Sequence, residues 1–246
     1  MNSGDASRIQ ELSGFLTESR FRKFRDVLSQ RTRFVSVVLE DLYDPHNGSA
    51  CLRSCEACGI QEVHIVEERN AFMTVEGVTM GSARWLDLRR HYPPDAEGNA
   101  MLSDKHSGAS IGQCYAGLRD RGYTIVAMTP HPAADKAIAF DRLPLTNPVA
   151  VVFGSERDGL SETAMNEADL HTRLPIHGFV ESYNISVACA LTVFHLAGRI
   201  RNELLPEQWQ LSGEDHDSVL LSWLRSSIRN VELVERNLSS EPRVEP

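Results

Sequence analysis

The sequence predicts an α/β protein built on a mainly parallel sheet flanked by helices. Short apolar, β-branched runs alternate with segments long enough for helices, which is typical of strand–helix–strand units. The run VAVVFG, at 149–154, is continuously apolar up to its glycine, as in strands buried on both faces of a parallel sheet. Asn47 and Gly59 are of residue types that begin and end helices, and they bound the segment between the first two apolar runs.

The predicted elements alternate along the whole chain. Strands are expected at 34–40, 62–67, 84–90, 123–128, 149–154 and 169–176. Helices are expected at 5–30 (one or two), 47–59, 111–122, 184–204 and 217–234, the third closed by Gly122. The turn residues of 93–110 predict a loop, and a linker is expected around 206–213.

The helix at 184–204 is apolar almost all round in its first four turns. A helix of this kind has two surfaces to bury. One surface can pack on the sheet, and a second copy of the chain is a natural partner for the other. We therefore expect a homodimer.

Composition limits the class of protein. The 246 residues are 41% hydrophobic and 24% charged, which is ordinary for a soluble globular chain, and five cysteines do not suggest a disulfide framework. No apolar run reaches membrane-spanning length and the N-terminus has no signal-peptide core, so we expect a cytoplasmic protein. The net charge of −9 argues against a nucleic-acid partner over most of the surface.

The N-terminal segment departs from this acidic average. Between residues 20 and 33 six basic residues face a single acidic one. Such a run is commonly a solvated helix face, and the alternative is a surface for RNA phosphates. The candidate RNA-binding residues are Arg20, Arg22, Lys23 and Arg25.

Three cysteines in a C-x3-C-x2-C arrangement, Cys51, Cys55 and Cys58, raise the question of an iron–sulfur cluster. The same spacing places them on one stripe of a helix. Cluster ligands usually lie on a loop that can wrap around iron, whereas this segment carries helix-capping residues at both ends. We interpret the stripe as a buried helix face, and we expect no metal.

The remaining signals lie in three loops that leave or end predicted strands: DPHNGSACLR, FGSERDGLSE and LPIHGFVESYNISVACAL. The sequence has no Walker A motif, and no G-x-G-x-x-G follows a strand. In order and spacing the three loops resemble the motifs of the tRNA guanosine 2′-O-methyltransferase branch of the SPOUT superfamily. Asn47 and Arg53 match the first motif, Gly154 and Glu156 the second, and Asn184 the third, although Tyr183 stands where the family usually has leucine.

The resemblance implies a fold, a cofactor and a reaction. The fold would contain a C-terminal deep trefoil knot, with an RNA-contacting helical extension at 1–33, a methyltransferase domain at 34–204 and a C-terminal helical extension at 205–246. S-adenosylmethionine would donate a methyl group to a ribose 2′-hydroxyl of tRNA. The cofactor would be bound largely by backbone at the knot; the implied residues are Met128, Thr129, Gly154, Ser155, Glu156, Ile176, Tyr183 and Asn184.

The resemblance also implies catalytic roles for Arg53, Asn47, Glu156 and Asn184, with Arg53 meeting the cofactor bound by the other subunit. A neutral Arg53 acting as a base would cost on the order of 8 kcal/mol at pH 7. A charged Arg53 that holds a phosphate and stabilises a developing alkoxide is the favoured interpretation. Glu156 would orient either Arg53 or Asn47. The alternatives are methylation of ribosomal RNA or another tRNA position and, outside this class, RNA binding without catalysis.

Overall fold

A computed structural model describes residues 3–93 and 109–240, which form two compact units. One unit runs from Thr32 to Trp209, and the other combines the residues up to Arg31 with those from Gln210 onward. The loop predicted over 93–110 falls almost wholly outside the described residues. None of the described helices is long and apolar enough to cross a membrane.

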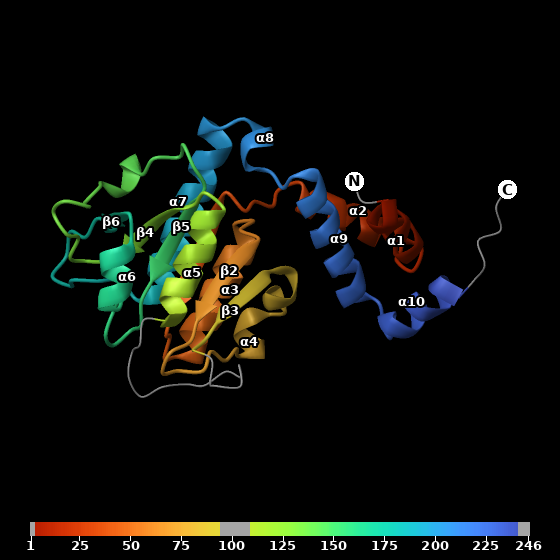
Figure 1. The fold of residues 1–246 in the computed structure, drawn as a ribbon, viewed down its shortest axis with the longest axis horizontal. Helices are drawn as coiled ribbons and strands as arrows, with labels where there is room; N and C mark the ends of the chain where they lie inside the picture. Colours follow the sequence, from red (N-terminus) through yellow and green to blue (C-terminus); the bar gives the residue numbers. More distant parts are fainter. Residues whose placement is uncertain (1–2, 94–108, 241–246) are drawn as a thin grey trace. The chain divides into compact units, whose positions relative to one another are not determined.

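The larger unit is built on a six-stranded sheet in the order β3-β2-β1-β5-β4-β6, with every pair parallel (Figure 1). The strands are β1 (Val35–Glu40), β2 (Glu62–Val66), β3 (Asp87–His91), β4 (Thr124–Met128), β5 (Val149–Phe153) and β6 (Leu170–Thr172). The predicted parallel α/β architecture is confirmed. All residues of β1, β2 and β5 are buried, which explains why β5, VAVVF, reads as a continuous apolar run. The trefoil knot itself stays a prediction.

Helices cover both faces of this sheet (Figure 1). α3 (Pro45–Ala57) and α7 (Ile185–Glu203) pack against one face and against each other, while α5 (Ala109–Asp120) and α6 (Glu162–Glu167) cover the other. A hydrophobic core lies on each face of the sheet, and alternate residues of β1 pack into one core or the other. Val37 packs on the α3 side and Val38 on the α5 side. The short helix α6 was not predicted, nor were α4 (Glu76–Thr79), η1 (Ser82–Trp85), η2 (Phe140–Arg142) and α8 (Pro206–Trp209).

The cysteine stripe lies on α3, as predicted. Cys51 and Cys55 have no exposed surface and belong to the core shared with Cys189 of α7, while Cys58 is the half-buried C-cap of the helix. Gly59 follows with a φ of 81°, the left-handed conformation expected of a residue that ends a helix. These thiols are small apolar fillers between two helices.

The start of α3 differs from the prediction. Asp44, not Asn47, is the N-cap, and its carboxylate accepts the backbone N–H of His46 at 2.9 Å. Pro45 occupies the first helical position, where its missing N–H costs nothing. Asn47 therefore lies in the first turn with its side chain available for other contacts.

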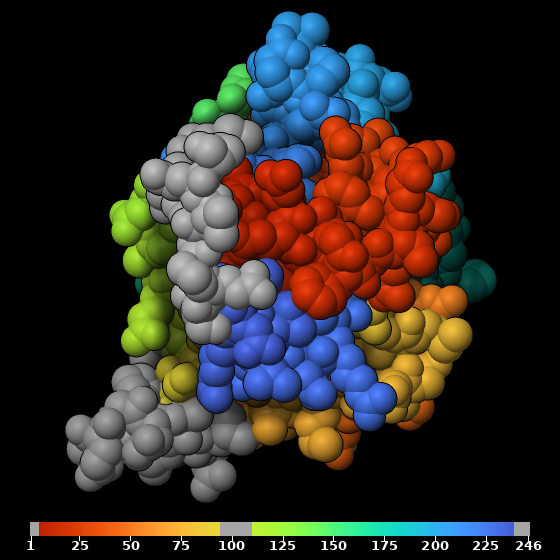
Figure 2. Space-filling view, turned by 90° about the vertical axis from the view of Figure 1, so that its right-hand side faces the viewer, coloured from red at the N-terminus to blue at the C-terminus, as the bar shows by residue number. Residues whose placement is uncertain are grey.

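The smaller unit consists of terminal helices from both ends of the chain. They are α1 (Ser3–Ser13), α2 (Glu18–Leu28), α9 (Gly213–Ser227) and α10 (Val231–Ser240). α1 and α2 both pack on α9, and Figure 2 shows the N-terminal segment (red) directly against the C-terminal one (deep blue). Phe24 and Trp223 meet edge to face at 5.9 Å between ring centres, which ties α2 to α9.

Two details of this unit differ from what the sequence predicted. The single helix predicted over 217–234 is two helices, because the chain breaks at Ile228 and passes through Asn230 with a φ of 56°. Arg31, counted in the basic run, is buried with its guanidinium 5.2 Å from the centre of the Trp223 ring. By contrast, the four candidate RNA-binding side chains of α2 are all exposed.

Candidate active site

The three motif loops leave the sheet at one edge. β1, β5, β4 and β6 are neighbours in that order and run parallel, so their carboxyl ends lie together. Just beyond β4, the backbone N–H of Thr129 donates to the carbonyl oxygen of Thr172, the last residue of β6, at 3.0 Å. Open α/β sheets bind ligands beyond the carboxyl ends of their strands. This edge is therefore the candidate site.

Glu156, in the loop after β5, is the acceptor that organises the first motif loop. Its carboxylate accepts the Nδ2–H of Asn47 at 2.9 Å and the backbone N–H of Tyr43 at 3.0 Å, with that of Asp44 at 3.4 Å. Hydrogen bonds to an ionised acceptor are about twice as strong as neutral ones. Of the two partners implied for Glu156, the structure brings Asn47 to it.

Asn184 connects the third motif to the same network. It is the N-cap of α7, and its Oδ1 accepts the backbone N–H of Ser186 at 2.9 Å and the hydroxyl of Ser186 at 2.7 Å. Its Nδ2 donates to Oδ1 of Asn47 at 3.1 Å. One side chain from each motif thus meets the next, although Asn47 and Asn184 are 137 positions apart in the sequence.

The second motif loop is folded tightly by its glycines. The backbone groups of Ser155 and Gly159 exchange two hydrogen bonds of 3.0 Å, and Gly159 has a φ of 70°. A Cβ added to Gly154 would lie 2.1 Å from the carbonyl carbon of Gly159, closer than any side chain permits. Ser161 then caps α6 and donates its hydroxyl at 2.6 Å and its backbone N–H at 3.0 Å to the buried carboxylate of Glu40. Both glycines are required by geometry.

A second set of contacts holds this loop in place, and the sequence did not predict it. Asp41, at a φ of 52°, accepts backbone N–H groups from the segment after β2 and a side-chain bond from Arg69, which also pairs with Asp158 at 2.5 Å. Burial raises the pKa of Asp41, but these hydrogen bonds outweigh it and hold that pKa below its ordinary value. No spacing in the sequence signals this contact.

Arg53 lies apart from the network within one chain. It is exposed on α3, six residues after Asn47, which places it about 240° further round the helix axis. Among the residues that the structure describes, no carboxylate pairs with its guanidinium. Its charge is available for a group from outside the chain.

The residues implied for the cofactor gather at the same edge. Met128, Thr129, Gly154 and Ile176 are half-buried, Ser155 is buried, and Tyr183 is exposed with its hydroxyl donating to the carbonyl oxygen of Pro175 at 3.1 Å. They combine apolar side chains with backbone groups at the ends of β4, β5 and β6. Such a lining suits a nucleoside, which needs apolar contact and a few directed polar groups.

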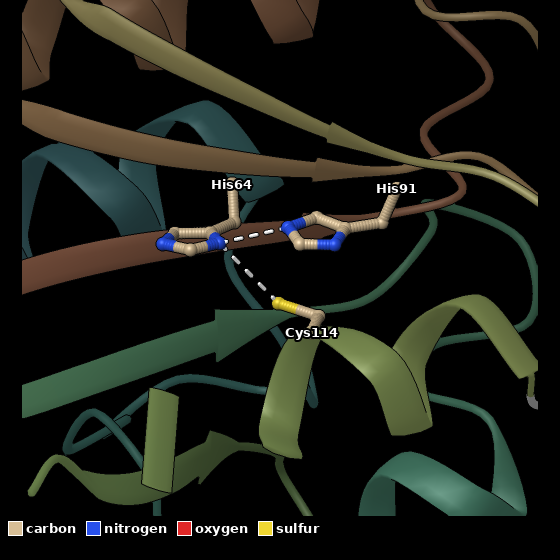
Figure 3. A group of neighbouring side chains, drawn as sticks. All are labelled: His64, His91 and Cys114. Atoms are coloured by element: carbon tan, nitrogen blue, oxygen red, sulfur yellow. Dashed lines mark hydrogen bonds between the residues drawn. The ribbon is translucent and has the colours of Figure 1, made fainter. Parts of the chain in front are cut away.

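A second cluster, away from this edge, combines His64, His91 and Cys114 (Figure 3). His64 Nε2 lies 2.8 Å from the carboxylate of Glu62, which accepts its hydrogen. Burial, with the charge of its neighbours, lowers the pKa of His91 to about 4, so this ring is neutral at pH 7, and its Nε2 shares a hydrogen bond of 2.9 Å with Nδ1 of His64.

The geometry of the two rings favours this hydrogen bond over a shared metal ion. The ring planes are only 12° from parallel, and the ring centres are 5.1 Å apart, as expected when the two nitrogens face each other head-on. A metal ion needs both lone pairs to converge on a point about 2.0–2.1 Å from each nitrogen. The Cys114 thiol, 3.5 Å from His64 Nδ1, completes a buried polar network.

Comparisons with known proteins show the family of this chain. The model of the SpoU rRNA Methylase family matches residues 35–194. A tRNA (guanosine(18)-2'-O)-methyltransferase of Borreliella burgdorferi is 31% identical over 240 residues, covering 98% of this chain and 100% of that protein. The Thermus thermophilus protein of the same name is 34% identical over 209 residues, covering 85% of this chain and 97% of its own.

A solved structure agrees as well. The A. aeolicus TrmH/SpoU tRNA modifying enzyme superposes with a TM-score of 0.69 at 24% identity, over 86% of this chain and 98% of that one, which supports the fold. The predicted methyltransferase resemblance is confirmed. The chain belongs to the SpoU rRNA methylase family.

Proposed function

We propose that the chain transfers the methyl group of S-adenosylmethionine to the ribose 2′-hydroxyl of a guanosine in the D-loop of tRNA. The observation that carries this proposal is the network joining Asn47, Glu156 and Asn184, because it assembles all three motifs beyond the strand ends. The names of the Borreliella burgdorferi and Thermus thermophilus relatives support guanosine in tRNA as the acceptor.

The cofactor would lie against the backbone after β4, β5 and β6. Met128 and Ile176 offer apolar surface, the folded loop at Gly154–Glu156 offers backbone groups, and the hydrogen bond of Tyr183 to Pro175 holds the last segment in place. When bound, S-adenosylmethionine supplies an electrophilic methyl carbon on a sulfonium. The chain has only to place the acceptor oxygen in line and favour loss of its proton.

Arg53 and the two asparagines would bind and orient the RNA ribose that accepts the methyl group. A charged Arg53 can grip the phosphate beside the acceptor ribose and stabilise the negative charge that develops on its oxygen. Asn47 and Asn184 would orient that ribose, with Glu156 holding Asn47 in position.

Arg53 would reach this site in a homodimer. The face of α7 that turns away from the sheet exposes 44% of Val187, 44% of Leu191 and 75% of Phe194, spaced along one helical stripe. Phe179, in the segment before this helix, is also fully exposed. A continuous apolar surface of this kind marks a protein interface. A second copy of the chain is the proposed occupant, and its α3 would present its Arg53 to the cofactor of the first.

The exposed basic side chains of α2 would contact the RNA at a distance from the chemistry. An electrostatic contact of this kind positions RNA without reading its sequence. From a tRNA substrate we also infer a cytoplasmic location.

The test is methyl transfer from radiolabelled S-adenosylmethionine to purified tRNA, with the methylated ribose mapped afterwards. Methylation of ribosomal RNA alone, or of another tRNA position, would favour the alternative substrates, and RNA binding without transfer would favour an inactive RNA-binding protein. Arg53→Ala should remove nearly all transfer while calorimetry still detects S-adenosylmethionine. Arg53→Lys should also be impaired because it loses the planar fork, and Arg142→Ala, at another exposed arginine, is the control.

Mixed dimers test whether the site is shared. Arg53→Ala and Asn184→Ala chains, each inactive alone, should regain activity when mixed, since half of the sites in a heterodimer then carry both residues intact. If mass spectrometry shows subunit exchange and activity stays absent, each subunit uses its own Arg53.

A further inference from the structure

The structure places an unusual pair of side chains beside the network. The guanidinium carbon of Arg157 lies 3.7 Å from the centre of the Tyr43 ring, so the two groups are stacked. Both side chains are exposed, and Tyr43 retains 53% of its surface. A large aromatic ring held at the surface by a cation gains little from burial, so stability alone does not account for it.

Two of the other arginine–aromatic pairs among the described residues also pair with a carboxylate. Arg121 lies 5.1 Å from the Tyr123 ring and also pairs with the buried carboxylate of Glu62. Arg90 lies 5.9 Å from Phe72 and also pairs with Glu67. Arg157, in the part of the chain that the structure covers, has no such carboxylate partner. Its positive charge is left for a ligand.

The backbone fixes where this pair stands. The N–H of Tyr43 donates to the Glu156 carboxylate at 3.0 Å, and Arg157 directly follows Glu156 in the chain. The stacked pair is therefore anchored to the same carboxylate that holds Asn47. A nucleotide whose ribose reaches the asparagines brings its base, or the base of a neighbour, to this position.

We propose that Tyr43 and Arg157 form a stacking platform for an unpaired nucleobase of the RNA strand that is methylated. Proteins that recognise unpaired RNA stack its bases on aromatic rings and on arginine planes, and the guanidinium can also bond an adjacent phosphate. This inference rests on the proposed methylation of RNA, and it assigns base recognition to residues outside the catalytic network.

The test compares Tyr43→Ala with Tyr43→Phe, which keeps the ring. Loss of one stacked base, about 1–3 kcal/mol, corresponds to a rise of roughly 5- to 150-fold in the KM for RNA. Tyr43→Ala should show this rise with an unchanged dissociation constant for S-adenosylmethionine, and Tyr43→Phe should stay within a few-fold of the unsubstituted protein. Tyr92→Ala, at another exposed tyrosine of the same unit, is the control.

A fluorescent readout separates stacking from a structural effect. RNA substrates would carry 2-aminopurine at the methylated nucleotide or at either neighbour. One of these positions should be quenched on binding to the unsubstituted protein and to Tyr43→Phe, but not to Tyr43→Ala or Arg157→Ala. Equal quenching and equal KM in all variants would overturn the platform while leaving the proposed function intact. Failure of the unsubstituted protein to methylate RNA would instead overturn the proposed function.

Discussion

Asn47→Asp is the sharpest test of the network at the sheet edge. The substitution keeps the shape of the side chain but replaces the Nδ2–H donor, 2.9 Å from Glu156, with a second carboxylate oxygen. Two like charges at that separation repel by about 1.4 kcal/mol in bulk water and by about 6 kcal/mol at an effective dielectric constant of 20. The lost hydrogen bond to a charged group adds about 1.5–3 kcal/mol.

Because the site is open to solvent, the lower values apply and Asn47→Asp should reduce the free energy of unfolding by about 3 kcal/mol. Asn47→Ala loses the bond to Glu156 and also the bond from Asn184, which the aspartate would keep, but it adds no charge, so it should cost only about 2 kcal/mol. Urea unfolding followed by circular dichroism measures both, and an unchanged m-value would show that the midpoints report stability. Methyl transfer should fall in both variants.

The double variant Asn47→Asp with Glu156→Gln provides the control. It exchanges donor and acceptor across the same 2.9 Å contact, while the remaining oxygen at position 156 still accepts the backbone N–H of Tyr43. Stability should recover relative to Asn47→Asp alone. The hypothesis that Asn47 donates to an ionised Glu156 would be refuted by two results together. Asn47→Asp would be as stable as Asn47→Ala, and the double variant would be no more stable than Asn47→Asp.

Three further outcomes are expected. Arg22→Ala with Lys23→Ala should weaken RNA binding and reduce the slope of log affinity against log salt by about 2, with S-adenosylmethionine binding intact; an unchanged slope would place the RNA elsewhere. Cys55→Ala should keep methyl transfer, because the thiol is a buried helix contact, and a brown anaerobic preparation absorbing in the visible would contradict this reading. Gly154→Ala should force the loop open and lower the affinity for S-adenosylmethionine at least about tenfold by calorimetry, whereas Gly117→Ala, where a Cβ meets nothing within 4 Å, should not.

The central strands β1 and β5 could be predicted because they are buried on both faces and consist mostly of apolar residues. Gly59 and Gly122 marked helix ends for an equally local reason, since both adopt the left-handed conformation. The start of α3 was misplaced because two capping residue types stand three positions apart; the proline after Asp44 was the signal that decides between them.

Other features depend on contacts that no local pattern records. The break between α9 and α10 has neither glycine nor proline, and Asn230 alone takes the left-handed turn. The burial of Arg31 requires Trp223, which is distant in the sequence. In the site, the motifs predicted which residues matter, but the bond between Asn47 and Asn184 depends on how the strands are ordered in the sheet.

The asparagine network also has a direction. Ser186 donates to Asn184, Asn184 to Asn47, and Asn47 to Glu156, which as a carboxylate has no hydrogen to give back. Rotating either amide by 180° would exchange its nitrogen and oxygen and so lose its hydrogen bonds to both neighbours. Each amide therefore keeps one orientation. Each amide nitrogen then has a second hydrogen that the chain of bonds does not use. What the two asparagines offer an incoming ribose is thus a pair of N–H groups, suited to an oxygen that gains negative charge as its proton leaves.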